Sequence, residues 1–415
     1  MTTFIIIPPK PIGAASLSKP VNIDGFLAER REANASLLRK TLADQNAIDF
    51  MRSIQGSAPQ QPWRGSGGTR RGKKPPRSLD AVGAVLVDDL STDELANLRR
   101  QGARVLENIE IRGIEPMEWP KKRSNSAFGA WHLNKVGASY YHATGITGKD
   151  TLIGIADTGI DATHPEFEGK TVYFSEFDSD GNQLATPTID RGEHGTHVAG
   201  LAAGRNCGIA PGASLAVAAV LTTKNAEGKM VGTLAQVLAG FNWLLQTKFD
   251  NGQRVSVLNA SLSSDGWNDY ALDIFEEATS LRSVALVAAI GNNGPDPNKH
   301  GSPGNYQCVV GVGATDVNDQ IANFSDHGVV PQQGGIQKPD ICAPGVNVES
   351  ALPGGTYGAM SGTSMASPIV AGACALLREE DPSTLASTKA LTQALRDKVV
   401  PVGNAAGSGL GRLQL

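Results

Sequence analysis

Residues 151–159 read Thr-Leu-Ile-Gly-Ile-Ala-Asp-Thr-Gly, a mainly apolar run that ends in a carboxylate and a turn. A short apolar run of this kind is typical of a strand that is buried on both faces. Similar runs follow at 214–221, 255–260, 284–290 and 308–313, and helical patterns lie at 232–247, 269–282, 364–379 and 384–397. This alternation predicts an α/β fold, with a mostly parallel sheet and helices on both of its faces.

The composition of the 415-residue chain indicates a folded protein and excludes two classes of function. Hydrophobic residues make up 40% and charged residues 19%, so most of the chain is expected to fold around a core. The formal net charge of −4 excludes a globally basic nucleic-acid binder. No run approaches the roughly 18 consecutive apolar residues of a transmembrane helix. We therefore expect neither a nucleic-acid partner nor a membrane partner, and we expect a monomer.

The N-terminus and the cysteines bear on the cellular compartment. Residues 1–9 carry no basic residue, and their apolar run stops at Pro8, which is too early for a secretory signal. The cysteines, Cys207, Cys308, Cys342 and Cys374, lack Cys-x-x-Cys spacing, so we expect reduced thiols rather than disulfides. These features predict a cytoplasmic protein, and export without a signal peptide stays open.

Composition divides the chain into segments. The expected segments are an N-terminal extension with a helix (1–54), a basic Gly/Pro-rich linker (55–78), a small α+β unit (79–116), a short polar linker (117–125) and a large α/β domain (126–415). The basic linker holds too little apolar surface to fold by itself. A solvated linker is the favoured interpretation, and contact with nucleic acid is the alternative.

The small unit has a strand–helix–strand pattern. A strand is predicted at 82–87 and another at 104–111, and between them Ser91 and Glu94 have the spacing of a capping box that opens a helix. A unit of this size has too little core to be stable alone. We therefore expect it to dock on the large domain.

Three segments place reactive side chains at strand ends or helix starts. They are Ile-Ala-Asp-Thr-Gly at 155–159, His-Gly-Thr-His-Val-Ala-Gly at 194–200 and Gly-Thr-Ser-Met-Ala-Ser-Pro at 362–368. Sites in open α/β sheets form at the carboxyl ends of the strands. Hydrolysis by a serine nucleophile needs a histidine to take its proton and a carboxylate to orient the histidine. Asp157, His194 and Ser364 have the chemistry for these three roles.

These motifs, in this order, resemble the signature motifs of the subtilisin-like serine proteases, the subtilase family. The resemblance covers roughly residues 126–400 and implies a serine endopeptidase that acts on proteins or peptides. It implies that Ser364 is the nucleophile, that His194 is general base and then general acid, and that Asp157 orients His194. The alternative is a catalytically degenerate module that only binds peptides, and its mark would be a lost triad residue.

The resemblance also implies an oxyanion hole and a substrate cleft. Asn292, at the end of Val-Ala-Ala-Ile-Gly-Asn at 287–292, would donate to the oxyanion, with the backbone N–H of Ser364 as second donor. A turn residue is the alternative role for Asn292. The implied substrate-binding residues are Ser261, Leu262, Ser263, Ala289, Gly291 and Gly301. Because these walls are small and carry no acid, we expect cleavage after apolar residues.

No cofactor is expected to be required, and no metal ligands are assigned. The turn Gly204–Gly208 follows the His194 helix almost directly, so the tight calcium site of many secreted relatives is expected to be absent. Residues 178–182 resemble part of a calcium loop but lack its closing glutamate, which leaves a small chance of calcium there. His197 is expected to be structural.

Residues 82–116 resemble the end of the family's prosegment. The resemblance implies a zymogen that is inhibited by its own N-terminal segment and processes itself within 117–126. In that case residues 112–116 would lead into the active cleft, beside Ser261.

Overall fold

The computed structural model describes residues 2–9, 23–41, 76–119, 122–123, 130–250, 252–282, 284–294, 296, 299–386, 388–402 and 405–415. Residues 42–54 of the predicted N-terminal extension, most of the predicted basic linker and part of the predicted polar linker lie outside the described residues, so the predictions for them are not tested.

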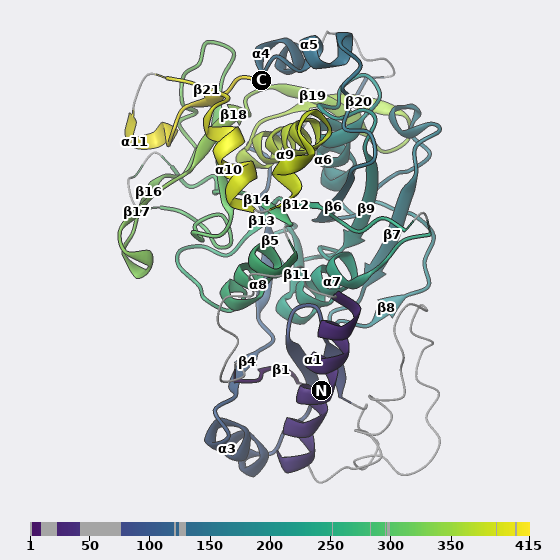
Figure 1. Cartoon of the computed structure of the whole chain (residues 1–415), viewed down its shortest axis with the longest axis vertical. Helices are drawn as coiled ribbons and strands as arrows, with labels where there is room; N and C mark the ends of the chain where they lie inside the picture. The colour runs from purple at the N-terminus through teal and green to yellow at the C-terminus, as the bar shows by residue number, and fades with distance from the viewer. Residues whose placement is uncertain are drawn as a thin grey trace.

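A ten-stranded sheet forms the centre of the large domain (Figure 1). Its strand order is β21 (Val399–Val400), β22 (Arg412–Leu413), β18 (Ile341–Pro344), β15 (Val310–Thr315), β14 (Ala285–Ala289), β12 (Val257–Ala260), β6 (Leu152–Asp157), β9 (Ser214–Ala219), β7 (Val172–Phe177) and β8 (Gln183–Leu184). The strands from β22 to β7 are parallel to their neighbours, and β21 and β8 are antiparallel at the two edges. The predicted α/β class with a mostly parallel sheet is confirmed.

Helices cover both faces of this sheet, which is why its strands are apolar throughout. Ile153 and Ile155 of β6 face α6 (His194–Ala203) and α9 (Thr363–Glu380). Leu152 and Ala156 face the side of α7 (Leu234–Gln246) and α8 (Leu272–Arg282). Each strand therefore buries side chains in two cores.

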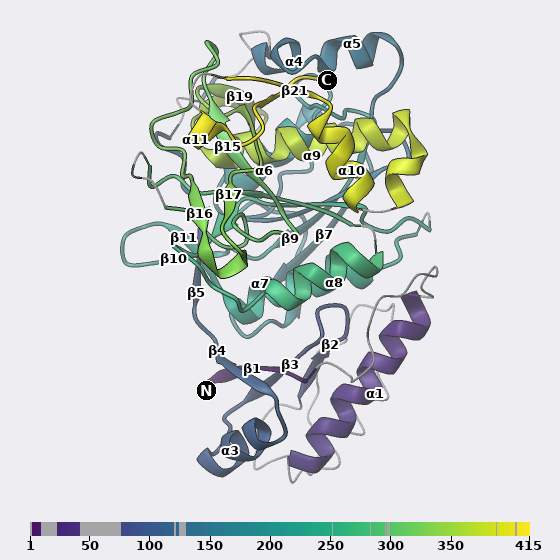
Figure 2. The ribbon, with the colours of Figure 1, turned by 60° about the vertical axis from the view of Figure 1, so that its left-hand side comes forward.

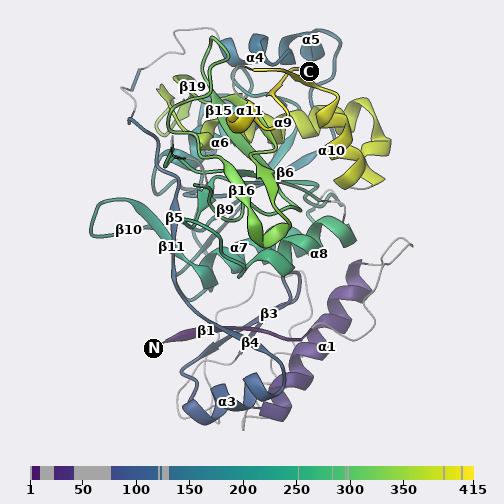
Figure 3. The same cartoon turned by 90° about the vertical axis from the view of Figure 1, so that its left-hand side faces the viewer.

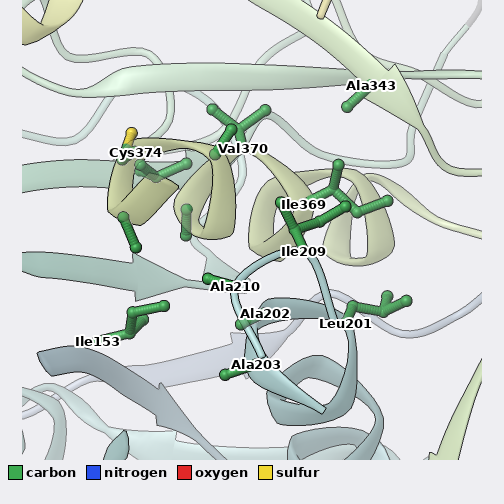
Figure 4. Packing of buried hydrophobic residues seen from close by; sticks show 14 of the residues in the cluster. Ile153, Leu201, Ala202, Ala203, Ile209, Ala210, Ala343, Ile369, Val370 and Cys374 are labelled. Atoms are coloured by element: carbon green, nitrogen blue, oxygen red, sulfur yellow. The ribbon is translucent and has the colours of Figure 1, made fainter. Parts of the chain in front are cut away.

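The helices α6 and α9, whose first turns carry two of the predicted catalytic residues, pack closely on each other; Figure 4 shows part of their shared apolar core. Ile369 and Val370 of α9 pack over Leu201 of α6 and over Ile209, which follows it. A Cβ on Gly372 would lie 2.6 Å from the Ile209 Cβ, so only glycine permits this approach.

The remaining elements of the large domain border the sheet. They are α4 (Trp131–Lys135), α5 (Ala138–Ala143), α10 (Thr388–Arg396), α11 (Ala405–Ser408), the hairpins β16 (Gly328–Val330)–β17 (Ile336–Lys338) and β19 (Val348–Leu352)–β20 (Thr356–Met360), and the 3₁₀ turns η2 (Pro165–Phe167), η3 (Pro331–Gln333) and η4 (Pro382–Ala386). Among the described residues, none of the helices combines the length and the apolar character needed to cross a membrane.

A smaller antiparallel sheet forms the N-terminal domain. Its order is β2 (Arg77–Leu79), β3 (Ala84–Asp88), β1 (Thr3–Ile7) and β4 (Arg104–Glu107), and α1 (Ile23–Thr41) and α3 (Thr92–Arg100) cover one face. The sequence did not predict β1, yet it is a central strand, paired with both β3 and β4. The predicted extension (1–54), the end of the predicted linker (55–78) and the small unit (79–116) therefore all contribute strands to one sheet, because β2 already begins at Arg77. The capping box of Ser91 and Glu94 is present at the start of α3, as predicted.

The other face of this small sheet packs on the large domain (Figure 2). Ile5, Ile7 and Leu86 join the core around α7 and α8, and these helices lie between the two sheets. Ion pairs border this contact: Arg104 meets Asp269 at 2.9 Å and Asp273 at 3.0 Å. The docking supplies the core that the small domain lacks alone.

The predicted strand at 104–111 is broken in two. Only β4 belongs to the N-terminal domain. β5 (Glu110–Gly113) instead joins a sheet in the order β10 (Thr223–Lys224), β11 (Met230–Thr233), β5 and β13 (Leu262–Ser263) (Figure 3). Asn108 lies at the break, where its Oδ1 accepts from Ala235 N in the first turn of α7 at 2.8 Å.

Candidate active site

The three motifs meet at the carboxyl edge of the parallel sheet. Asp157 is the last residue of β6, His194 is the first residue of α6, and Ser364 lies in the first turn of α9. All three side chains are buried. Because strands and helices alternate in direction, strand ends and helix starts collect at one edge, as predicted for this fold.

Asp157 and His194 form a buried pair. The Nδ1–H of His194 donates to Asp157 Oδ1 at 2.8 Å and lies 3.0 Å from Oδ2. Oδ1 also accepts from Thr158 N at 2.7 Å, which fixes the carboxylate. Burial lowers the pKa of His194, but the charge and hydrogen bond of Asp157 outweigh it, so the pKa is raised overall. The other ring nitrogen, Nε2, is then left for a second partner, and the His194 side chain lines a small cavity together with Ile114 and Glu115.

The Ser364 hydroxyl is engaged with an N-terminal segment rather than with the histidine. Ser364 Oγ donates to Ile114 O at 2.9 Å. Within the described part of the chain, His194 Nε2 is buried and has no hydrogen-bond partner. The nucleophile candidate and the base candidate are therefore not hydrogen-bonded while residue 114 is present.

The amide of Asn292 is held in one orientation. Its Oδ1 accepts from Thr363 N and from Thr363 Oγ1, each at 2.9 Å, so Nδ2 points away from α9. Nδ2 donates to Glu115 O at 3.1 Å. A Cβ on Gly362 would come within 3.0 Å of Nδ2, so glycine leaves room for the amide. A fixed donor of this kind can stabilise charge that develops on an oxygen.

The predicted substrate strand is occupied by the chain itself. β5 pairs with β13 on one side, where Leu262 faces Gly113 and Ser263 faces Arg112. On its other side it pairs with β11, where Gly232 faces Ile111. Ile114 N continues the ladder to Ser261 O at 3.5 Å. An extended peptide added between two strands gains main-chain hydrogen bonds on both edges.

Two side chains of this segment border small cavities. Ile111 is buried and lines an apolar cavity together with Leu234, Leu262, Tyr270 and Phe275. Glu115 lines a second cavity, together with Thr158, His194, Leu221 and Met230. Its Oε1 accepts from Met230 N at 3.0 Å. Beyond it, Met117 N donates to Ser361 O at 2.8 Å, so contacts continue on both sides of the Ser364 hydroxyl.

The predicted pocket walls lie next to one another. Ser263 faces Gly301: a Cβ on that glycine would lie only 1.7 Å from Ser263 Oγ. Ser264 and Ser302 form a bridge beside them, with N–H···O distances of 2.9 and 3.1 Å. Ala289 is the buried last residue of β14, and Gly291 follows it. Ser263 therefore narrows the space above Gly301.

An acid that the sequence pattern did not indicate lies behind this wall. A Cβ on Gly291 would lie 2.1 Å from Asp326 Oδ2. The Asp326 carboxyl accepts from Asn293 N at 2.6 Å and from Asn293 Nδ2 at 3.0 Å. Burial raises the pKa of Asp326 above its ordinary value, against the lowering effect of the Asn293 donors. The expected walls, Ala289, Gly291 and Gly301, carry no acid themselves, and this neighbouring carboxyl is buried and already hydrogen-bonded to Asn293.

Two weaker candidates have local partners. His197 Nε2 lies 3.1 Å from Gly358 O, and burial lowers the pKa of His197 to about 3. In the loop at 178–182, Asp178 Oδ1 accepts from Asp180 N and Asn182 N, as in a polar turn. No group of three or more His, Cys, Asp or Glu residues that could hold a metal ion occurs among the residues that the structure describes.

A buried glutamate stabilises the short turn that follows α6. Glu166 accepts from Asn206 N at 2.7 Å, from Cys207 N at 3.2 Å and from Tyr357 Oη at 2.9 Å. The sequence motifs contain no signal for it, because Glu166 lies 40 residues before Asn206. Its carboxylate satisfies the backbone N–H groups of the turn.

Comparison with known proteins agrees with this geometry. Residues 148–410 match the model of the subtilase family. Subtilisin BL from Lederbergia lenta is 36% identical over 291 residues, which cover 68% of this chain and 95% of that protein. Serine protease AprX from Bacillus subtilis (strain 168) is 38% identical over 272 residues, which cover 57% of this chain and 59% of that protein. The chain belongs to the subtilase family and is a serine-type endopeptidase.

Proposed function

We propose that Asp157, His194 and Ser364 act as the catalytic triad of this endopeptidase, and that the intact chain is a zymogen. In the zymogen, residues 110–117 occupy the cleft as an inhibitor. The observation that carries the proposal is that Ser364 and Asn292 both contact main-chain carbonyls of this one segment.

In the proposed mechanism, Ser364 Oγ attacks the substrate carbonyl carbon while His194 Nε2 takes the Oγ proton. The Asp157 carboxylate, already hydrogen-bonded to Nδ1, stabilises the imidazolium that forms. The carbonyl π electrons move to oxygen, and Asn292 Nδ2 donates to the resulting oxyanion. Collapse breaks the C–N bond, the leaving amine takes the proton from His194, and an acyl ester remains on Ser364.

Water then completes the reaction. His194 takes a proton from the water as its oxygen attacks the acyl carbon. The second tetrahedral intermediate releases a carboxylic acid product and returns the proton to Ser364 Oγ. Substrates are proteins or peptides, because an extended main chain pairs with β11 and β13.

The contacts of residues 110–117 support their role as an inhibitor. Ser364 Oγ donates to the carbonyl of Ile114, and Asn292 Nδ2 donates to the carbonyl of Glu115. β5 also takes the strand positions beside β11 and β13, so a substrate strand cannot enter while the segment is bound. Processing is proposed to occur within 117–126, beyond these contacts.

A fluorophosphonate probe, which reacts with an activated serine, tests the proposal. We expect labelling to increase as the N-terminal part is lost, and Ser364→Ala to be neither labelled nor cut. Ser367→Ala is the matched control, because its hydroxyl lies on the same helix but donates to Asn259. Labelling of intact chain at the full rate, or self-cleavage of Ser364→Ala, would contradict the proposal. No observation favours the alternative of a peptide-binding module.

A further inference from the structure

One edge of β20 contacts the chain that leads away from the candidate nucleophile. β20 pairs with β19 along its inner edge, and Arg123 forms an antiparallel bridge with Tyr357 on the other side. In this bridge Arg123 N donates to Tyr357 O at 3.0 Å, and Tyr357 N donates to Arg123 O at 2.9 Å. Nearer to Ser364, Met117 N donates to Ser361 O at 2.8 Å. Residues 117 and 123 are therefore held along one edge, in the direction antiparallel to β20.

This outer edge, which consists of Tyr357, Ala359 and Ser361, can hold an extended peptide of any sequence. Alternate residues of a strand direct their N–H and C=O groups to the same side, so Ala359 shares the side on which Tyr357 and Ser361 have partners. A strand edge of this kind takes up a further strand through main-chain hydrogen bonds. The contacts to residues 117 and 123 give the direction in which such a strand runs.

Buried side chains fix the outer edge from behind. Tyr357 Oη donates to Glu166 Oε1 at 2.9 Å, and the His164 ring packs edge-on against the Tyr357 ring, with 4.9 Å between the centroids. His197 Nε2 lies 3.1 Å from Gly358 O. The proposed catalytic steps use none of these contacts. Their effect is to hold β20 in place before a peptide arrives, which lowers the entropy that binding costs.

A carboxylate lies beside the outer edge. Lys122 Nζ forms an ion pair with Glu193, the residue directly before His194. Within the part of the chain that the structure describes, the Glu193 side chain makes no capping hydrogen bond to α6, so its charge is directed to the segment instead. Both partners are partly exposed, and an exposed ion pair adds selectivity more than affinity. The segment itself is basic, because residues 121–123 read Lys-Lys-Arg.

We propose that the outer edge of β20, together with Glu193, binds the part of a substrate that follows the cleaved bond, and that it favours extended segments with a basic residue. In the intact chain residues 117–123 are held there from both sides. A cut within 117–126 leaves them held from one side at most, so that a substrate replaces them. The inference rests on the proposed triad and zymogen, and it adds a class of preferred substrate to them.

The main-chain contacts are tested by binding, without catalysis. Processed enzyme is blocked at Ser364 with a fluorophosphonate and trimmed with trypsin after Arg123, and a fluorescent peptide with the sequence of residues 117–126 is added. We expect saturable binding by fluorescence anisotropy. Methylation of the peptide nitrogen at Arg123, which removes the donor to Tyr357, should weaken binding about fivefold. The same change at Lys122 is the matched control, because the N–H of the preceding residue points to the other side of an extended chain.

The outcomes of this titration separate the two proposals. No saturable binding, or equal losses from the two methylations, would overturn the role of the outer edge. Full-length Ser364→Ala should bind the peptide far more weakly than processed enzyme, because its own segment is in place. A serine that the fluorophosphonate does not label would refute the proposed triad, and the peptide result would still stand because binding does not need that hydroxyl.

The charge preference is tested with two fluorogenic peptides on processed enzyme. They are identical as far as the second residue after the cleaved bond, and the following six residues carry either lysines or glutamates. We expect kcat/KM to be about threefold higher for the lysine peptide, and Glu193→Gln to remove this preference. Glu227→Gln is the matched control, since it removes an exposed carboxylate of the β10–β11 hairpin and should keep the preference. Equal rates for the two peptides in the wild type, or equal effects of the two substitutions, would overturn the role of Glu193.

Discussion

The hydroxyl of Ser364 donates to the carbonyl oxygen of Ile114, 250 residues earlier in the chain, at 2.9 Å. While that bond exists, the hydroxyl proton of Ser364 is donated to Ile114 O, and His194 Nε2 has no hydrogen-bond partner among the described residues. A general base must instead accept that proton from the hydroxyl. Under the proposed zymogen, loss of residue 114 would free the hydroxyl to turn toward the imidazole. The predictions on the N-terminal segment below rest on that proposal.

Ile111→Ser in the full chain is predicted to weaken autoinhibition. Ile111 is buried beside the apolar side chains with which it lines a cavity, and loss of a buried aliphatic side chain costs roughly 2 kcal/mol, or about thirtyfold in the occupancy of the cleft by the segment. The rate at which the N-terminal part is lost, followed by gel, should rise accordingly. Arg112→Ser is the matched control, because the next side chain of β5 is half exposed. Equal effects of the two substitutions would show that the burial of Ile111 does not hold the segment.

Asn292→Leu is predicted to lower kcat by more than an order of magnitude with little change in KM, because its donor bond strengthens only as the oxyanion forms. Thr363 already orients the amide in the resting site, so the wild-type residue needs no rearrangement. Steady-state kinetics on processed enzyme check this. A change confined to KM would mean that Asn292 only shapes the turn. Asn293→Ala is the control, because it alters the next residue of the turn, which contacts Asp326, and leaves the Asn292 amide in place.

The pH dependence should follow the raised pKa of His194. Burial lowers this pKa, and Asp157 raises it above the ordinary value of about 6.5; Glu115 adds to the rise only in the intact chain, where the proposed inhibitory segment is present. The base works when neutral, so kcat/KM should rise with pH through the raised pKa. The stabilisation from the protonated imidazole is complete below the unfolded pKa and is lost as pH rises through the folded pKa.

The contribution of Glu115 can be separated by NMR. In full-length Ser364→Ala protein, Glu115→Gln should lower the pKa of His194, because a negative charge is removed from its pocket. Glu107→Gln, an exposed carboxylate in β4, is the control. An unchanged His194 titration would place the Glu115 charge too far from the ring to matter.

Local motifs predicted that the three candidate catalytic residues lie at one edge of the sheet, and the structure brings them to that edge. Asp157, His194 and Ser364 each follow from a short segment, and the parallel sheet brings strand ends and helix starts to one edge. β1 was missed because its four apolar residues end at a proline, and their pairing with β3 and β4 is visible only in three dimensions. The break at Asn108 was missed for a related reason. The alternation of apolar and polar residues continues from β4 into β5, but β4 pairs with β1 and β5 pairs with β11 and β13.

Asp326 and Lys338 show the limit of motif reasoning. Their partners, Asn293 and the carbonyls of Tyr306 and Val309, lie about thirty residues away, and the oxygens belong to the backbone. A residue pattern carries no signal for where a backbone carbonyl points. Such contacts depend on how loops fold over the sheet.

Ser263→Gly is predicted to broaden the preference at the residue before the cleaved bond. The Ser263 hydroxyl occupies space directly over Gly301, so its removal admits a larger apolar side chain. We expect kcat/KM for phenylalanine relative to alanine at that position to rise about tenfold, the discrimination that one small group provides in an apolar pocket. Ser264→Gly, which adds the same backbone freedom one residue later, should change this ratio far less.

The wild-type enzyme and the Ser263→Gly variant should both cleave poorly after Arg or Lys. The nearby Asp326 carboxyl is buried and already accepts hydrogen bonds from Asn293, so it is not available to pair with a basic side chain of the substrate. A peptide-library profile dominated by basic residues would mean that Asp326 reaches the pocket as a charge, and that the apolar assignment of its walls is wrong.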